Sequence, residues 1–198
     1  MQQQPTINWA ILCTGWGRNA TDVIQTHGKG KLGRSRIKLL IYEQIPCGAA
    51  EEAQKQGIET IQVQRNNFPT IGSYQDHILQ LLKKREIDHV FLMNYKYRVR
   101  EAMLLAFPNR IYNVHPSLFP SFLGTKTAIQ DALEYGVKIT GITTHIINHE
   151  LDMGMILEQK AIKIKDNDNF DSLYPKFVRA GKKIIIKTIN NVGEKYSG

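Results

Sequence analysis

Residues that build cross-linked or metal-bound scaffolds are scarce in this sequence of 198 residues. There are only two cysteines, Cys13 and Cys47, and their spacing fits neither a disulfide framework nor a zinc motif. Because free cysteine is commonly buried, we expect both to serve in packing. The histidines and carboxylates show no metal-ligand spacing either, so we predict that the protein binds no metal.

Long apolar runs are also lacking. No uninterrupted hydrophobic segment approaches the roughly 20 residues that a membrane-spanning helix needs, and the polar N-terminus has no signal-peptide core. We therefore expect a cytoplasmic protein that does not act at a membrane. No linker, repeat or low-complexity segment interrupts the chain. This predicts a single domain over residues 1–198, with residues 1–6 as a flexible N-terminal tail.

Positive charge is in excess, with 26 lysines and arginines against 18 aspartates and glutamates, a formal net charge of +8. The basic residues are scattered in short groups, and no arginine-rich tract interleaved with aromatic residues is present. We therefore expect no nucleic-acid partner. A cleft for a small anionic substrate is compatible with this charge, although charge alone does not select it.

Short apolar segments alternate with amphipathic ones along the first part of the chain. Segment 90–93 is apolar without polar alternation, as in a strand that is covered on both faces. Strands that alternate with helices indicate an α/β fold with a doubly wound, mostly parallel, Rossmann-like sheet. We expect strands at 8–13, 37–42, 60–63, 90–93, 110–114, 140–147 and 155–165. We expect helices at 20–26, 49–56, 73–85 (with Ser73 as N-cap), 100–107, 127–134 and 170–190.

The glycine-containing segment Gly-Trp-Gly-Arg-Asn at residues 15–19 follows the first expected strand and opens a helix. Backbone N–H groups at a helix N-terminus attract phosphate, and glycine lets the backbone approach a ligand closely. A turn without a ligand favours glycine equally well, and the Gly-Lys-Ser/Thr of a P-loop is missing. The segment alone is therefore a weak signal for a phosphate site, to which the Arg18 guanidinium can add a two-pronged contact.

The most informative residues are Asn113, His115 and Asp152, which supply an amide, an imidazole and a carboxylate. Histidine exchanges a proton near neutral pH, an asparagine amide can donate a hydrogen bond to an oxyanion, and aspartate can orient the histidine. Asn113 and His115 are two residues apart, so they point to the same side of a strand end. This set can move an acyl group onto an amine, provided that the fold brings Asp152 close.

The sequence motifs around these residues resemble those of the folate-dependent formyltransferases. They are Asn-Val-His-Pro-Ser-Leu-Phe-Pro at 113–120, Ala-Leu-Glu-Tyr-Gly-Val-Lys-Ile-Thr-Gly at 132–141, Thr-Thr-His at 143–145 and Glu-Leu-Asp-Met-Gly at 150–154. The resemblance runs from about Ile7 to about Asn190 and is greatest to members that formylate glycinamide ribonucleotide in purine synthesis. It implies transfer of a formyl group from N10-formyltetrahydrofolate to a primary amine without a metal. We expect a monomer or a homodimer.

The same resemblance implies roles for individual residues. Asn113 and His115 would stabilise the oxyanion, Asp152 would organise a water and tune His115, and Thr143 and His145 would support them. In the family the matching glycine loop holds the ribotide phosphate, which assigns Gly15, Gly17, Arg18 and Asn19 to that site. The pterin ring of the folate would lie between two loops, largely recognised by backbone groups. The residues of these loops are Tyr95, Lys96, Tyr97, Arg98, Val99, Ile147, Glu150 and Leu151.

Several positions on the acceptor side depart from the glycinamide pattern, namely Trp16, Gly181 and the segment 94–97. Three alternatives therefore stay open. One is formylation of a nucleotide-linked amino sugar, because Trp16, Tyr95 and Tyr97 could stack a base. The others are hydrolysis of formyltetrahydrofolate by a deformylase and binding of folate or nucleotide without catalysis.

Overall fold

A computed structural model describes residues 5–195, and in it seven strands form one sheet in the order β3-β2-β1-β4-β5-β6-β7. The pairs up to β5 are parallel, whereas β6 and β7 are antiparallel to their neighbours. The predicted α/β fold with a mostly parallel sheet is therefore confirmed. The strands are β1 (Ile7–Cys13), β2 (Ser35–Tyr42), β3 (Glu59–Gln62), β4 (His89–Leu92), β5 (Ile111–His115), β6 (Ile139–Ile146) and β7 (Ile156–Lys163).

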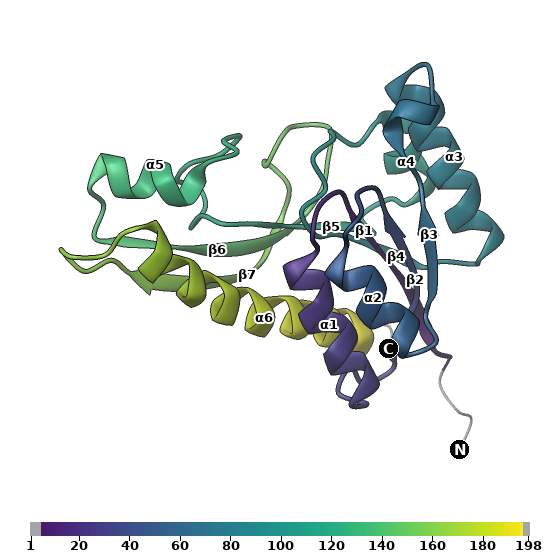
Figure 1. The fold of residues 1–198 in the computed structure, drawn as a ribbon, viewed down its shortest axis with the longest axis horizontal. Coiled ribbons are helices and arrows are strands. Elements are labelled where there is room, and N and C mark those ends of the chain that lie inside the picture. Colours follow the sequence, from purple (N-terminus) through teal and green to yellow (C-terminus); the bar gives the residue numbers. More distant parts are fainter. Residues whose placement is uncertain (1–4, 196–198) are drawn as a thin grey trace.

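The helices cover the sheet, and α6 runs along the β6–β7 hairpin beside α1 (Figure 1). Residues 1–6 are the predicted N-terminal tail, and of these residues 1–4 lie outside the described part of the chain. The Pro5 carbonyl accepts a hydrogen bond of 2.8 Å from the Arg34 guanidinium. The helices are α1 (Arg18–Gly28), α2 (Gly48–Lys55), α3 (Ile71–Lys84), α4 (Glu101–Ala106), α5 (Ala128–Tyr135) and α6 (Phe170–Lys195), with a short 3-10 helix η1 (Arg65–Asn67).

The core is divided by the sheet into two apolar clusters. Successive side chains of a strand point to opposite faces, so Trp9 and Ile11 of β1 join one cluster while Ala10 and Leu12 join the other. The first cluster packs against α1, α2 and α6, and the second against α3 and α4. The central strands are thus covered on both faces, as their continuous apolar sequences predict.

Helix α3 begins earlier than its apolar spacing predicts. Its N-cap is Thr70, whose hydroxyl accepts the Ser73 N–H at 3.0 Å while the Ser73 hydroxyl accepts the Thr70 N–H at 3.2 Å. Ser73 is therefore the third residue of the helix, in a reciprocal capping box, and not the N-cap. The prediction is wrong because Thr70 and Ser73 both carry a hydroxyl that suits an N-cap. Helix α6 also continues beyond residue 190, to Lys195.

The loops after β1 and β4 meet at one edge of the sheet. These two strands are neighbours, and the helices that follow them, α1 and α4, pack on opposite faces of the sheet. Such a switch point leaves a crevice at the carboxyl ends of the strands. The Thr14 N–H and hydroxyl both donate to the Asn94 carbonyl, at 3.1 and 2.8 Å, and so join the two loops. The fold thereby places the glycine segment beside the loop that starts at Asn94.

Candidate active site

Strands β5 and β6 supply four of the residues that the sequence predicts for the site. In their antiparallel register Asn113 lies opposite His145, and His115 lies opposite Thr143. Asn113 and His115 end β5 on the same side, as their spacing predicts. Pairing with β6 therefore adds an imidazole next to the amide without any sequence motif that joins the two.

His115 is buried and its two ring nitrogens have different partners. Its Nε2 lies 3.1 Å from the Phe122 carbonyl, and since a carbonyl only accepts, Nε2 carries a proton. The Nδ1 atom lies 3.6 Å from Oδ2 of Asp152. Because Nε2 donates, Nδ1 is the ring nitrogen that faces the carboxylate.

Asp152 reaches this place from the long loop between β6 and β7. Its backbone has φ +56°, a left-handed conformation that aspartate tolerates better than most residues. Its Oδ2 accepts the Gly124 N–H at 2.9 Å, and its side chain is only 8% exposed. The carboxylate is thus fixed between the segment that follows β5 and the two imidazoles.

His145 serves as a neutral acceptor. Burial is the largest cause that lowers the pKa of His145, and this outweighs the opposing effect of Asp152. Its Nδ1 donates to the Ile146 carbonyl at 3.1 Å, so Nε2 is free to accept from the Asn113 amide at 3.2 Å. This bond orients the Asn113 amide and leaves its second N–H for a ligand.

These side chains lie in a cavity of about 540 Å³. The same cavity is lined by both loops to which the resemblance assigned folate binding. The structure therefore brings the predicted catalytic residues and the predicted folate-binding residues into one space. The sequence-predicted residues in its lining are Tyr95, Lys96, Tyr97, Arg98, Val99, Asn113, His115, His145, Ile147, Glu150, Leu151 and Asp152.

Two side chains that no sequence signal identified hold the first of the two predicted folate loops, residues 95–99. Gln75 of α3 is buried, donates to the Arg98 carbonyl at 2.8 Å and accepts the Arg100 N–H at 2.9 Å. Glu43 accepts the Tyr97 hydroxyl at 2.8 Å. Burial is the largest of the causes that raise the pKa of Tyr97, so this hydroxyl stays a donor. Neither residue belongs to a motif, and only the fold brings them to the loop.

The two predicted folate loops are joined directly. Arg98 donates from Nη2 to the His149 carbonyl at 2.6 Å. Tyr95 and Tyr97 pack edge to face with ring centroids 5.5 Å apart, and Gln75 lies 3.4 Å from the Tyr95 hydroxyl. These rings are engaged in packing, so of the three aromatic residues considered for base stacking only Trp16, 54% exposed, is largely accessible.

Thr143 lies beneath the site and does not line the cavity. Its hydroxyl donates to the Ser117 carbonyl at 2.8 Å and accepts the Phe119 N–H at 3.2 Å. Gln159 also donates to it, at 3.1 Å. These contacts use the hydroxyl fully, so Thr143 holds the turn that follows His115.

The glycine segment borders the cavity without lining it. Gly17 has φ +78°, and α1 begins after it with no side-chain cap. A Cβ on Gly15 would lie 2.9 Å from the amide nitrogen of Asn94, which itself lines the cavity.

The two polar residues of the segment contact neighbouring helical residues. The Arg18 guanidinium lies 3.5 Å from the Asp22 carboxylate, one turn along α1. Asn19 lies against Gly181 of α6. A Cβ added to Gly181 would lie 3.3 Å from the side-chain oxygen of Asn19. Gly181 thus allows α6 to approach this segment closely.

Neither a membrane span nor a metal cluster is found over residues 5–195. No helix in that range is long and apolar enough to cross a membrane. No group of three or more histidine, cysteine, aspartate or glutamate side chains in the same range is placed to hold a metal ion.

Comparison with known proteins gives a consistent result. A family model described as formyl transferase matches residues 7–189. The phosphoribosylglycinamide formyltransferase of Bacillus subtilis is 28% identical over 193 residues, which cover 94% of this chain and 98% of the relative. The chloroplastic enzyme of the same name from Arabidopsis thaliana is also 28% identical over 94% of this chain, but the match spans only 65% of the relative's length.

Solved structures are similar over most of the chain. A glycinamide ribonucleotide transformylase from Symbiobacterium toebii has a TM-score of 0.92 and 29% identity, over 98% of this chain and 90% of that one. A phosphoribosylglycinamide formyltransferase from Bacillus halodurans has a TM-score of 0.88 and 31% identity, over 93% of this chain and 94% of that one. Because the family model covers nearly the whole sequence, this chain belongs to the formyl transferase family.

Proposed function

We propose that this chain transfers the formyl group of N10-formyltetrahydrofolate to the amine of glycinamide ribonucleotide, a step of purine synthesis. The observation that carries the proposal is one cavity that contains Asn113, His115 and Asp152 together with both predicted folate loops. The relatives whose names describe this activity support the choice of acceptor.

The residues can carry the charge and the proton that this reaction moves. The acceptor amine bonds to the formyl carbon, whose oxygen becomes negatively charged. The free N–H of Asn113 can donate to this oxyanion, and so can Nδ1 of His115 when it carries a proton. The amine then loses a proton while N10 of the departing folate gains one. His115 and Asp152, 3.6 Å apart, can hold that proton between the two steps.

The cavity suits a folate in its chemistry. Val99, Ile147 and Leu151 give it apolar surface for a flat ring, and the loop backbones give donors and acceptors. Lys96 and Arg98 lie at the same cavity and match the carboxylates of a folate. We assign the folate to this space as co-substrate, with no metal in the reaction.

An assay with a 10-formyl-dideazafolate donor tests the proposal. We expect release of the deformylated folate only when glycinamide ribonucleotide is present. Release without acceptor would identify a deformylase, and release only with amino-sugar nucleotides would identify the sugar formyltransferase, for which the exposed Trp16 ring is the favourable feature. Absence of release with every acceptor would leave a binding module and overturn the proposal.

The substitution Arg18→Ala tests the acceptor phosphate site separately. If Arg18 binds phosphate beside the N-terminus of α1, the KM for the acceptor rises by about tenfold while kcat changes less. Arg36→Ala is the matched control, because Arg36 lies at the start of β2, at the opposite end of the strands from the glycine segment. An unchanged KM in Arg18→Ala would remove Arg18 from the site.

The oligomeric state and the cytoplasmic location stay predictions. Relatives of this chain include chloroplastic enzymes, so membership of the family does not determine the compartment.

A further inference from the structure

A second cavity, of about 700 Å³, lies between β7 and α6, and we call it the basic groove. Five cations line it, and none of its lining residues is acidic. Lys176 is paired with Asp168 at 2.6 Å and Lys182 with Asp22 at 3.4 Å. The other three, which are Lys160, Arg179 and Lys183, have no ion-pair partner among residues 5–195. The groove therefore carries positive charge that the described chain does not neutralise.

The groove follows the backbone edge of β7. This strand is the last in the sheet, so its outer N–H and C=O groups pair with no other strand in the described part of the chain. Three consecutive residues, 160–162, line the groove. Successive side chains of a strand point to opposite faces, so contact with all three residues indicates that the groove reaches the outer edge of the strand. A ligand there meets unpaired peptide groups as well as cations.

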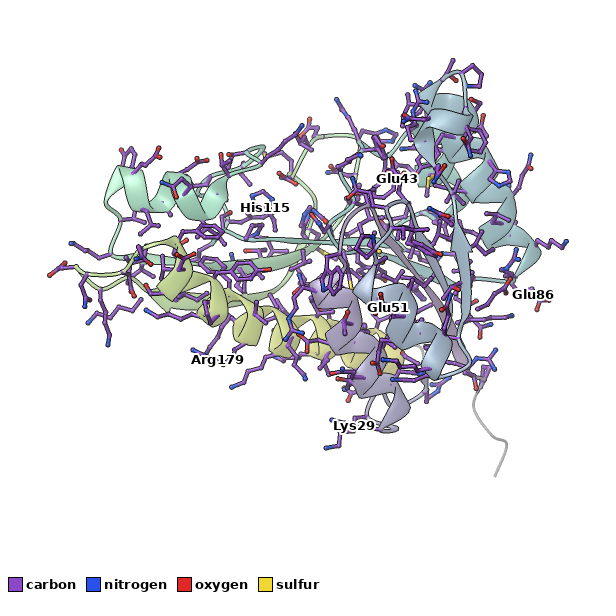
Figure 2. All side chains as sticks on the ribbon, in the orientation of Figure 1. Lys29, Glu43, Glu51, Glu86, His115 and Arg179 are labelled. Carbon is purple, nitrogen blue, oxygen red and sulfur yellow. The ribbon has the colours of Figure 1, made fainter. Side chains whose placement is uncertain are left out.

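The cations of α6 form one stripe beside this edge. Lys176, Arg179 and Lys183 are three and four residues apart, which places them on one face of the helix. Ala180 and Ile186 lie between and beyond them and give the groove an apolar floor. Figure 2 shows Arg179 on the outer side of α6, away from His115. The groove shares no lining residue with the cavity that contains His115, although Lys182 pairs with Asp22, the same carboxylate that Arg18 approaches.

We propose that the basic groove binds an acidic segment of another protein, in extended conformation, as an added strand on β7. Main-chain hydrogen bonds would pair the segment with the free edge, and its alternate acidic side chains would point toward the cations of α6. A second copy of this chain fits poorly, because its groove would bring the same cations. Nucleic acid would match the charge but not the row of peptide groups.

A direct test uses fluorescence anisotropy with a labelled peptide of alternating glutamate and valine, matched in length to the eight residues of β7. Alternation places every carboxylate on one side of the extended peptide. A blocked peptide with all glutamates first has the same composition and charge and is the control for that arrangement. We expect the alternating peptide to bind at least about tenfold more tightly than the blocked one.

Two variants and two modified peptides complete the test. Arg179→Glu with Lys183→Glu is expected to weaken binding by at least about tenfold, whereas Lys83→Glu with Lys84→Glu on α3 changes the charge equally and leaves binding unchanged. Thermal unfolding checks that both variants fold. Methylation of alternate backbone nitrogens of the peptide removes the donors of one edge. Methylation of one set should abolish binding and methylation of the other set should not.

Any of four results would overturn the proposal. Equal binding to wild type and to the α6 variant would place the site elsewhere. Equal binding of both methylated peptides would exclude an added strand. Binding of a single-stranded RNA oligonucleotide in preference to the peptide would mean a nucleic-acid site. No peptide binding would mean that the β7 lysines only protect an exposed edge. None of these readouts depends on formyl transfer.

Discussion

The carboxylate of Asp152 lies between two imidazoles that hold their protons differently. His145, whose pKa is lowered by burial, stays neutral and accepts from Asn113. His115 keeps a proton on Nε2 for the Phe122 carbonyl and turns Nδ1 toward Asp152. His145 Nε2 lies 3.7 Å from the carboxylate, about as close as His115 Nδ1, but it is occupied as the acceptor of the Asn113 amide. We therefore assign the proton exchange with Asp152 to His115.

Replacement of Asp152 tests this arrangement. In Asp152→Asn the amide oxygen can still accept the Gly124 N–H, so the loop should stay in place while the charge is lost. We expect kcat for formyl transfer to fall by at least about 100-fold with the circular dichroism spectrum unchanged, and a similar fall for His115→Ala. Asp166→Asn, at an exposed carboxylate outside the cavity, is the control. Wild-type turnover in either site variant would refute the assigned roles.

His89 gives a prediction about stability and pH. Burial lowers the pKa of His89 from about 6.5 to about 4, so below about pH 6.5 the unfolded chain binds a proton that the folded chain does not. Stability must then fall as the pH falls. For His89 alone we expect a loss of about 2 kcal/mol between about pH 7.5 and about pH 5.

Urea unfolding of His89→Gln measures this contribution. The glutamine cannot titrate, and its amide can still accept the Tyr112 hydroxyl that lies 3.0 Å from His89 Nδ1. We expect a shallower dependence of the unfolding free energy on pH than in wild type. Parallel curves for the two proteins would show that His89 does not titrate in this range.

The loop that carries Asp152 depends on a glycine. A Cβ on Gly154 would lie 1.6 Å from the Ile146 carbonyl oxygen, which belongs to the backbone of β6 and cannot rotate away. The substitution Gly154→Ala must therefore move the loop and with it Asp152. We expect kcat to fall about as far as in Asp152→Asn, by about 100-fold or more.

Gly193→Ala is the matched control for that substitution. Gly193 lies in α6, and the new methyl group would make only an ordinary contact, 3.5 Å from the Ser35 hydroxyl. Turnover of Gly193→Ala should equal that of wild type. Full activity of Gly154→Ala would show that the loop tolerates displacement and that its position is not essential.

Some elements can be predicted from their sequences and others cannot. The strands β1 and β4 are continuous apolar runs because helices cover both faces, and this pattern is visible in the sequence. The sequence places the start of α3 at Ser73 wrongly because hydroxyl residues at 70 and 73 both fit a cap, and only the reciprocal bonds decide between them. The antiparallel direction of β6 depends on its pairing with β5, which no local pattern encodes.

The same division holds for the candidate site as a whole. Asn113, His115 and Asp152 belong to recognisable sequence motifs, so the family resemblance alone is enough to identify them as candidates. Gln75 and Glu43, which hold the first predicted folate loop, come from distant segments and belong to no motif. The exposure of Trp16 and the packing of Tyr95 against Tyr97 likewise follow from the assembled molecule. Residues that take part in the reaction are thus easier to find in the sequence than residues that only hold a loop in place.

The candidate site lies where the strand order of the sheet reverses and where its pairing changes from parallel to antiparallel. Between β1 and β4 the chain order reverses, and beyond β5 the strands turn antiparallel. The glycine segment, the two predicted folate loops and the end of β5 all lie along this edge (Figure 1). A donor and an acceptor bound there would meet over Asn113 and His115, which is the geometry that the proposed transfer needs.

Following the formyl carbon itself is the most direct measurement of this account. A donor with a ¹³C-labelled formyl group is mixed with glycinamide ribonucleotide and wild-type protein, and the carbon is observed by NMR. We predict that the label moves from the folate to the amide of the acceptor, and that Asp152→Asn suppresses this transfer. Label that stays on the folate, or that is released as formate whether or not the acceptor is present, would contradict it.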